Sequence, residues 1–332
     1  MNKQFVCGDI GGTKTILQSA EINNGKVRAL LTHRYDNHNF ATFSEIFQDF
    51  LNRTRGADRP LAACFAVAGP VVTQQAKLTN LPWQINSSTL STEFSIPAVK
   101  LINDFEAAAL GIESLSPDDV AILQAGKSLT HSMRVVLGAG TGMGVAWLTW
   151  FEDRYFAVPT EAGHMDFAPT STLQIQLLET LHNKFGHVSV ERLLSGSGLT
   201  NIFKFLQMNS ATASNLAPIH LEEDSGATIT TLALTHQHPI AIKSINIFAD
   251  IYGAYAGNLA LTGLTRGGVY IAGGIAPRIL NILKLGGFMR AFHAKGRFSE
   301  LMREFPVYII TNPEVSLLGA KQEAHHLLNS QS

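Results

Sequence analysis

The sequence is poor in cysteine and in charge, and both shortages exclude classes of protein. Among 332 residues only Cys7 and Cys64 are cysteines. Two cysteines cannot form a disulfide framework or a cysteine zinc site, and both lie in apolar segments typical of buried thiols. Lys and Arg number 25 against 26 Asp and Glu. Without a basic excess, we expect no binding to nucleic acid or to acidic membrane surfaces.

Signals for export and for membrane insertion are also lacking. The charged residue Asp9 interrupts the N-terminal apolar run before it is long enough to form a signal-peptide core. The stretch 135–151 holds 17 uncharged residues, which is near the lower limit for a membrane span. Its four glycines disfavour a helix. We therefore expect a cytoplasmic protein with no membrane segment.

Apolar residues, at 45%, and glycine, with 28 positions, are abundant. An apolar chain of this length can bury a sizeable core, and a prior of roughly 150 residues per domain predicts two domains. Near the N-terminus, apolar spacing predicts three strands joined by a glycine turn and a hairpin, then a helix and two buried strands, with a second helix after them. These elements are expected at 5–10, 15–22, 27–34, 43–51, 61–68, 99–102 and 105–110.

The same order begins again about 130 residues later. Strands are predicted at 134–137, 143–151, 155–159, 268–272 and 307–311, and helices at 173–185, 188–194, 199–207, 241–261 and 317–328. This repetition indicates an α/β fold made of a duplicated βββαβα unit, with a cleft between the halves. Residues 208–238 are polar and turn-rich without clear periodicity, and we predict a mostly surface insertion there.

Three glycine turns follow predicted strands, at 9–13, 138–144 and 273–274. Glycine lets the backbone approach a ligand closely, so that N–H groups can point at phosphate oxygens. The spacing fits neither the P-loop nor the dinucleotide fingerprint, whose third glycine would fall at Met143. A hairpin alone would also need glycine, but three such turns favour phosphate binding. Asp9 could hold Mg²⁺ beside a phosphate or stabilise an Asx turn.

Asn103 and Asp104 stand between a buried strand and an alanine-rich helix. Either residue could cap that helix. The functional interpretation is that Asp104 accepts a proton from a substrate hydroxyl.

Glu161 and His164 flank a glycine in an otherwise apolar stretch. They could bind the hydroxyl groups of a polyol, or they could stabilise a turn. His187 and Glu191 are expected on one face of the helix predicted at 188–194, where Glu191 is either a ligand or a solvated residue.

These segments together resemble the bacterial glucokinase family. The matching segments, in the family's order, are 9–13, 103–105, 140–144, 161–169, 186–192 and 272–278. They extend over nearly the whole chain, from residue 5 to about 325. The family belongs to the actin-like ATPase superfamily, so the resemblance implies a ribonuclease-H-like duplication. We expect a small α/β domain of residues 1–114 plus 314–332, which forms a wall of the ATP and sugar cleft, and a large one of residues 115–313 with helical insertions.

The resemblance also implies an activity and the residues that serve it. The activity is ATP-dependent phosphorylation of glucose at its 6-hydroxyl, with Asp104 as general base and Asp9 holding Mg²⁺ through water. The implied sugar ligands are Asn103, Asp104, Glu161, His164 and Glu191. The implied ATP-binding residues are Gly11, Gly12, Thr13, Gly140, Thr141, Gly142, Gly273 and Gly274. Lys14 stands where many members carry Asn, and a homodimer is the family expectation.

Two other functions remain open from the sequence. One is a kinase for another hexose, such as mannose or an N-acetylhexosamine, because a single hydroxyl contact decides between these sugars. The other is a sugar-sensing regulator without catalysis. Regulators of the related family carry a DNA-binding helix-turn-helix, which we do not expect here because the first strand begins near residue 5.

Overall fold

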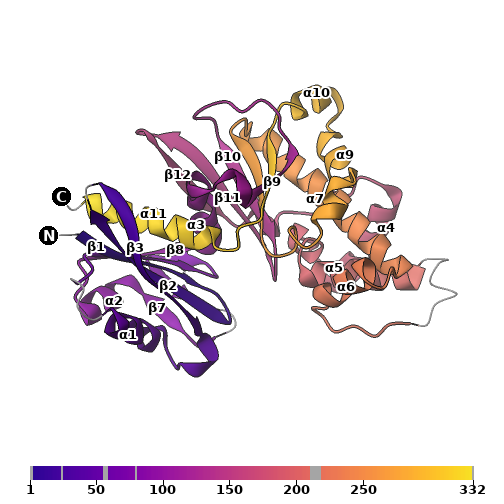
Figure 1. The fold of residues 1–332 in the computed structure, drawn as a ribbon. Coiled ribbons are helices and arrows are strands. Elements are labelled where there is room, and N and C mark those ends of the chain that lie inside the picture. The colour runs from indigo at the N-terminus through magenta and orange to yellow at the C-terminus, as the bar shows by residue number, and fades with distance from the viewer. Residues whose placement is uncertain (1–2, 24, 55–58, 79–80, 210–217, 331–332) are drawn as a thin grey trace. The chain divides into compact units, whose positions relative to one another are not determined.

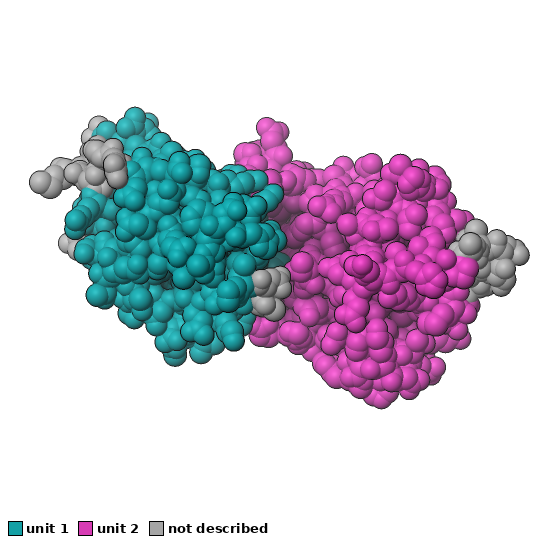
Figure 2. All heavy atoms as spheres, turned by 90° about the horizontal axis from the view of Figure 1, so that it is seen from below, with its two compact units in different colours: residues 1–115, 314–332 teal, residues 116–313 magenta. Residues whose placement is uncertain are grey.

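The computed structural model describes residues 3–23, 25–54, 59–78, 81–209 and 218–330. They form a mixed α/β protein with three sheets, whose elements are labelled in Figure 1. The chain divides into two compact units, coloured separately in Figure 2: residues 1–115 with 314–332, and residues 116–313. Each unit buries its own apolar cluster, so each has a core of its own.

The first unit is organised by a mixed sheet of five strands: β1 (Lys3–Ile10), β2 (Lys14–Asn23), β3 (Lys26–Asp36), β4 (Ala62–Val67) and β8 (Ala98–Asn103). The strand order is β3-β2-β1-β4-β8; β1, β4 and β8 are parallel, and β2 is antiparallel to both β1 and β3. Every residue of β4 is fully buried. This is typical of a central strand that is covered on both faces.

Helices cover both faces of this sheet: α1 (Phe43–Arg53), α2 (Ser87–Phe94), α3 (Asp104–Gly111) and α11 (Val315–Ser330). α1 begins after Thr42, whose hydroxyl accepts from the N–H of Glu45. Its phenylalanines pack edge-to-face on Phe65 of β4. α11 lies on the opposite face and contacts β1 and β4 (Figure 1). A small antiparallel sheet contains β5 (Val71–Val72), β6 (Gln75–Lys77) and β7 (Gln84–Asn86).

α11 packs on α3 with almost no space between the two backbones. A Cβ atom on Gly319 would collide with the backbone carbonyl of Ala107. Near the start of both helices, the hydroxyl of Ser316 donates to the carbonyl oxygen of Asp104 over 3.1 Å. The last helix of the chain therefore braces the helix that begins at Asp104.

The second unit contains a six-stranded sheet: β9 (Val120–Gln124), β10 (Arg134–Ala139), β11 (Met143–Phe151), β12 (Arg154–Thr160), β13 (Gly268–Ala272) and β14 (Val307–Ile310). The strand order is β12-β11-β10-β13-β14-β9. β10, β13 and β14 are parallel, and the remaining pairs are antiparallel. All strands predicted in this unit are confirmed, whereas β9 was not predicted.

The helices of this unit are α4 (Thr172–Phe185), α5 (Gly196–Asn209), α6 (Gly226–Leu234), α7 (Pro239–Gly263), α8 (Leu280–Lys284), α9 (Gly287–His293) and α10 (Ser299–Met302). α7 is buried along most of its 25 residues and packs against α5, α6 and α9. Within the residues that the structure describes, no helix combines the length and the apolar character needed to cross a membrane.

The two large sheets repeat one pattern. In the first, β1 pairs antiparallel with β2 and parallel with β4. In the second, β10 pairs antiparallel with β11 and parallel with β13. The carboxyl ends of parallel strands lie at one edge of a sheet, where α/β proteins place their ligand sites. Each unit therefore gathers the residues that follow its parallel strands at one edge.

One predicted helix, at 188–194, is wrong. Only a single 3₁₀ turn, Val190–Arg192, forms there. The N–H of Val190 donates to the carbonyl of Met165 over 2.8 Å, and an isolated β-bridge joins the two segments. These contacts with a distant segment satisfy backbone groups that a local helix would otherwise pair, so His187 and Glu191 do not share a helix face.

The predicted surface insertion at 208–238 is also wrong in part. α6 lies within it and buries Ile229 and Ala233 against the core. Threonine has a low helix propensity, and the threonines of α6 obscure its apolar periodicity. Residues 210–217 lie outside the described part of the chain.

We predict that Gly319→Ala lowers the free energy of unfolding by about 1–3 kcal/mol, because the added methyl group forces α11 away from α3. Asn329→Ala, at an exposed position of the same helix, is the control and should stay within about 0.5 kcal/mol of wild type. Urea denaturation measures both. Equal stability of the two variants would mean that α3 and α11 can separate without loss.

Candidate active site

In the first unit, a glycine turn joins β1 to β2. The N–H of Gly11 donates to the carbonyl of Lys14 over 2.9 Å, which closes the turn around Gly12 and Thr13. Gly11 and Gly12 are half-buried, and Thr13 and Lys14 are exposed. A ligand can therefore reach the backbone of this turn, as a phosphate loop requires.

Asn37, which the sequence analysis did not single out, holds this turn from behind. It is fully buried, and its amide donates to the carbonyl of Gly11 over 2.9 Å. Its side-chain oxygen accepts from the hydroxyl of Thr15 over 2.8 Å, and its backbone N–H donates to Thr13 over 2.9 Å. One buried side chain thus fixes both ends of the turn.

Acidic residues gather near the carboxyl ends of β1 and β8. Burial, together with the carboxylates of Asp104 and Glu314, raises the pKa of Asp9 from 3.8 to about 7. A bound cation would relieve this repulsion. Within the described residues, no three His, Cys, Asp or Glu side chains form a metal cage. Mg²⁺ does not need one, since it binds through one or two carboxylates with water and phosphate. Asp9 fits that role.

Asn103 and Asp104 occupy the start of α3. The side-chain oxygen of Asn103 accepts from the N–H groups of Phe105 and Glu106, at 2.8 and 3.4 Å. Its amide also donates to the carbonyl of Gly69 over 3.0 Å. Asn103 is therefore the helix cap. Asp104 is the first helical residue and is half-buried.

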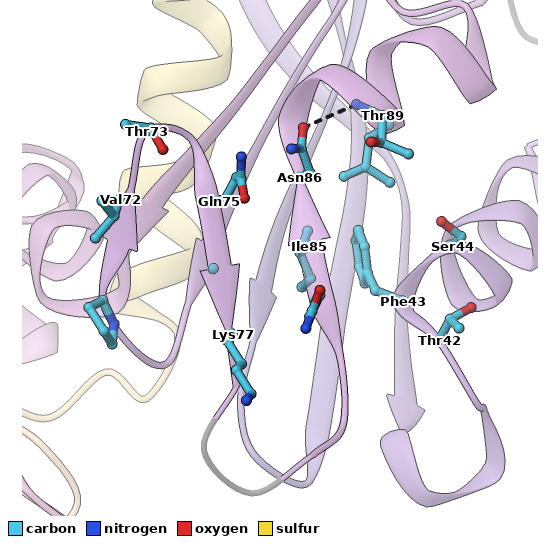
Figure 3. Close-up of a pocket in the computed structure, with 14 residues that line it drawn as sticks. Thr42, Phe43, Ser44, Val72, Thr73, Gln75, Lys77, Ile85, Asn86 and Thr89 are labelled. Carbon is cyan, nitrogen blue, oxygen red and sulfur yellow. Dashed lines mark hydrogen bonds between the residues drawn. The ribbon is translucent and has the colours of Figure 1, made fainter.

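A groove of about 800 Å³ opens beside this region, between the small sheet and the starts of α1 and α2 (Figure 3). Hydroxyl and amide side chains such as Thr73, Gln75 and Asn86 line it, together with Lys77. Its lining includes none of the predicted site residues and no carboxylate. The groove therefore lacks the groups that proton transfer requires.

In the second unit, the glycine turn between β10 and β11 has one open face. The N–H of Gly140 donates to the carbonyl of Gly142 over 2.8 Å, and the carbonyl of Gly140 accepts from Gly196 over 2.9 Å. A Cβ atom on Gly140 would meet no atom within 4 Å. Thr141 is exposed. The turn is fixed on one side and accessible on the other.

Glu191 joins this turn. Its carboxylate accepts from the N–H of Met143 over 2.9 Å. A Cβ atom on Gly142 would lie 2.6 Å from the same carboxylate oxygen, so a larger residue there would displace the Glu191 side chain. Glu191 is half-buried and lies in a 3₁₀ turn, so it is not a solvated helix residue. It is also not the partner of His187, which pairs with Asp166 over 2.8 Å.

Glu161 and His164 lie at the ends of one short turn. The N–H of His164 donates to the carbonyl of Glu161 over 3.0 Å, and both residues are exposed. A Cβ atom on Gly163, between them, would collide with the carbonyl of Met143. The turn therefore packs directly on the residue that also holds Glu191.

The third glycine turn, Gly273 and Gly274, meets the second. Gly273 has a φ of +81°, and a Cβ atom on it would lie 2.5 Å from the carbonyl oxygen of Ala139. That oxygen accepts from the N–H of Ile275 over 3.2 Å. Gly274 is exposed, with open space around it. The predicted residues of the second unit thus lie on loops linked through Ala139 and Met143.

Comparison with known proteins agrees with these features. The profile of the glucokinase family matches residues 6–327. The chain belongs to the glucokinase family. It is 41% identical to the glucokinase of Trichormus variabilis, and the alignment covers 95% of this chain and 97% of that one.

Solved structures of glucokinases share the fold. A glucokinase from an Antarctic psychrotroph is 29% identical, with a TM-score of 0.86 over 98% of this chain and 99% of that one. A ROK family glucokinase from Streptomyces griseus, solved with glucose and AMPPNP, is 21% identical, with a TM-score of 0.60 over 97% and 99%. The similarity to this second structure extends to the fold alone.

We predict that Asn37→Ala lowers the free energy of unfolding by about 2–3 kcal/mol, because it leaves the buried hydroxyl of Thr15 and the half-buried carbonyl of Gly11 without this partner. The control is Asn39→Ala, two residues further on and exposed, which should change stability by less than about 0.5 kcal/mol. Urea denaturation of both variants is the measurement. If they unfold together, the turn does not depend on Asn37.

We predict that Asp9→Asn is more stable than wild type at pH 8 in metal-free buffer. The raised pKa of Asp9 means that the folded protein binds this proton more tightly than the unfolded chain. Wild type therefore loses stability as the pH rises from about 4 to about 7, by up to about 1.4 kcal/mol over each pH unit. Denaturation curves of both proteins at pH 4 and pH 8 test this. A variant no more stable than wild type at pH 8 would refute the electrostatic argument.

Proposed function

We propose that the protein transfers the γ-phosphoryl group of ATP to the 6-hydroxyl of glucose, with Asp104 as general base. The observation that carries this proposal is the match to the glucokinase family over nearly the full chain. Phosphoryl transfer depends mainly on positioning and on neutralising charge, and less on covalent chemistry by the protein.

Asp104 is suited to accept the hydroxyl proton. It stands in the first turn of α3, where the helix dipole favours the ionised carboxylate. The cap formed by Asn103 and the bond from Ser316 hold the start of that helix in place. The amide of Asn103 has a second N–H that can be donated to a sugar hydroxyl.

In the second unit, Glu161, His164 and Glu191 would bind the other sugar hydroxyls. Two of these side chains are exposed, and the third keeps one carboxylate oxygen that the bond to Met143 does not use. Carboxylates accept hydrogen bonds from hydroxyls, and imidazole can donate or accept. The set therefore matches a polyol better than an apolar ligand.

The ATP phosphates would contact the backbone of Gly11, Gly12 and Thr13 and that of Gly140, Thr141 and Gly142. Gly273 and Gly274 would approach the nucleoside. Asp9 would hold Mg²⁺ through water, and the ion, when bound, neutralises charge on the phosphate oxygens. Turns with accessible N–H groups are suited to phosphate.

The shared strand order of the two large sheets supports a ribonuclease-H-like duplication, as in the actin-like ATPase superfamily. We propose that each copy contributes one glycine turn for phosphate. A homodimer, a cytoplasmic location and the absence of a nucleic-acid partner remain predictions.

We predict that Asp104→Asn lowers kcat for glucose by about 10²–10⁴-fold, because amide nitrogen cannot accept the hydroxyl proton. Asp118→Asn, a substitution of an exposed carboxylate, is the matched control. Formation of glucose 6-phosphate is measured with Mg·ATP, and mannose and N-acetylglucosamine are tested in parallel.

Full activity of the Asp104 variant would mean that this carboxylate is not the general base and has a structural role only. Faster turnover of another sugar would change the substrate but not the mechanism. Wild type that phosphorylates no sugar would favour a sugar-sensing regulator.

A further inference from the structure

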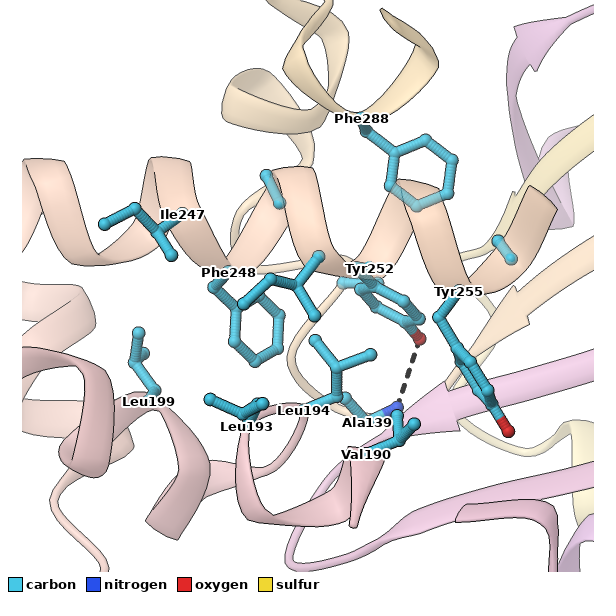
Figure 4. Close-up of a cluster of buried hydrophobic side chains, with 14 of the residues drawn as sticks. Ala139, Val190, Leu193, Leu194, Leu199, Ile247, Phe248, Tyr252, Tyr255 and Phe288 are labelled. Carbon is cyan, nitrogen blue, oxygen red and sulfur yellow. Dashed lines mark hydrogen bonds between the residues drawn. The ribbon is translucent and has the colours of Figure 1, made fainter. Parts of the chain in front are cut away.

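Two tyrosines of α7 bind loops of the second unit, and Figure 4 shows both side chains, with the bond between Tyr252 and Ala139 dashed. The hydroxyl oxygen of Tyr252 accepts from the N–H of Ala139 over 3.1 Å. One helical turn later, the hydroxyl of Tyr255 donates to the carbonyl of Ala162 over 2.7 Å. Both residues are buried, with 0% of Tyr252 and 5% of Tyr255 exposed.

The two backbone groups that these tyrosines bind belong to different candidate ligand loops. Ala139 ends β10 and begins the glycine turn that contains Gly140, and its carbonyl also binds the third glycine turn. Ala162 lies between Glu161 and His164. Tyr252 therefore touches the phosphate side of the site, whereas Tyr255 touches the sugar side.

Core packing does not require the hydroxyl of Tyr252. Tyr252 lies between Phe248 and Phe288, with ring centroids 5.7 Å away in both cases, so phenylalanine would fill the same space. Burying a phenolic hydroxyl costs free energy unless it is hydrogen-bonded. Burial also raises the pKa of both tyrosines, which keeps the hydroxyls protonated. Their specific role is to hold the two backbone groups.

We propose that Tyr252 and Tyr255 are positioning residues with separate tasks: Tyr252 sets the phosphate turn for ATP, and Tyr255 sets the turn that carries Glu161 and His164 for glucose. The assignment of ligands to the two turns rests on the proposed function. α7 thereby fixes the distance between the two turns, since both bonds come from one rigid helix.

The test uses Tyr252→Phe and Tyr255→Phe in the full chain, with Tyr155→Phe as the matched control. Tyr155 is 4% exposed, and its hydroxyl donates to the backbone carbonyl of Ser132 over 3.1 Å, outside the candidate site. Calorimetric titration gives Kd for glucose and for AMPPNP separately. Loss of one hydrogen bond to a ligand loop should weaken binding by about 5-fold.

We expect Tyr255→Phe to raise Kd for glucose and leave Kd for AMPPNP within about 2-fold, and Tyr252→Phe to do the reverse. Tyr155→Phe should change neither constant, although it removes a comparable bond. A merely structural role would lower Tm in all three variants without this separation. Equal effects of the two α7 variants on both ligands, or none beyond the control, would overturn the proposal.

Hydrogen exchange of the ligand-free protein separates this inference from the proposed function. Tyr252→Phe should speed exchange in residues 138–144, and Tyr255→Phe in residues 161–165, each leaving the other segment unchanged. If that pattern appears while wild type binds neither ligand, the proposed function fails and the positioning role stands. Without the pattern, the positioning role fails even if glucose is phosphorylated.

Discussion

The second half of the candidate site depends on how closely several backbones approach one another at Ala139 and Met143. Two positions in this region have no space for a side chain. The carbonyl of Met143 leaves no room for a Cβ atom on Gly163, and the carbonyl of Ala139 leaves little room for one on Gly273. Because the loops touch through main-chain atoms, a larger residue at either position would push two loops apart. The exposed groups of Glu161, His164 and Gly274 are supported by this packed layer.

Both units fix a glycine turn with a buried polar side chain from another element. In the first unit this is Asn37, and in the second it is Tyr252. Glycine gives a turn its shape but loses more entropy on ordering than other residues do. A buried hydrogen bond offsets that cost and selects one conformation of the turn, so that a ligand binding there would find the turn already formed.

The sequence could predict features that depend on local chemistry. Alternating apolar residues and glycine turns predicted every strand of the first large sheet and all but β9 of the second. Features that depend on distant partners were missed. The segment at 188–194 has helical spacing, yet it pairs with residues near Met165. Asn37 was missed because its side-chain partners, Gly11 and Thr15, lie more than twenty residues earlier in the chain. The one local signal was a polar residue directly after a strand.

The place of α11 in the first unit affects the order in which the protein can fold during synthesis. Residues 116–313 form a continuous unit and can fold as soon as they leave the ribosome. The first unit cannot, because the helix that covers one face of β1 and β4 is made only after the whole second unit. Until then, the ring of Phe5, which lies against His325 in the finished protein, and the start of α3 lack their cover. A chain that stops before residue 314 would keep that apolar face exposed and would be prone to aggregate.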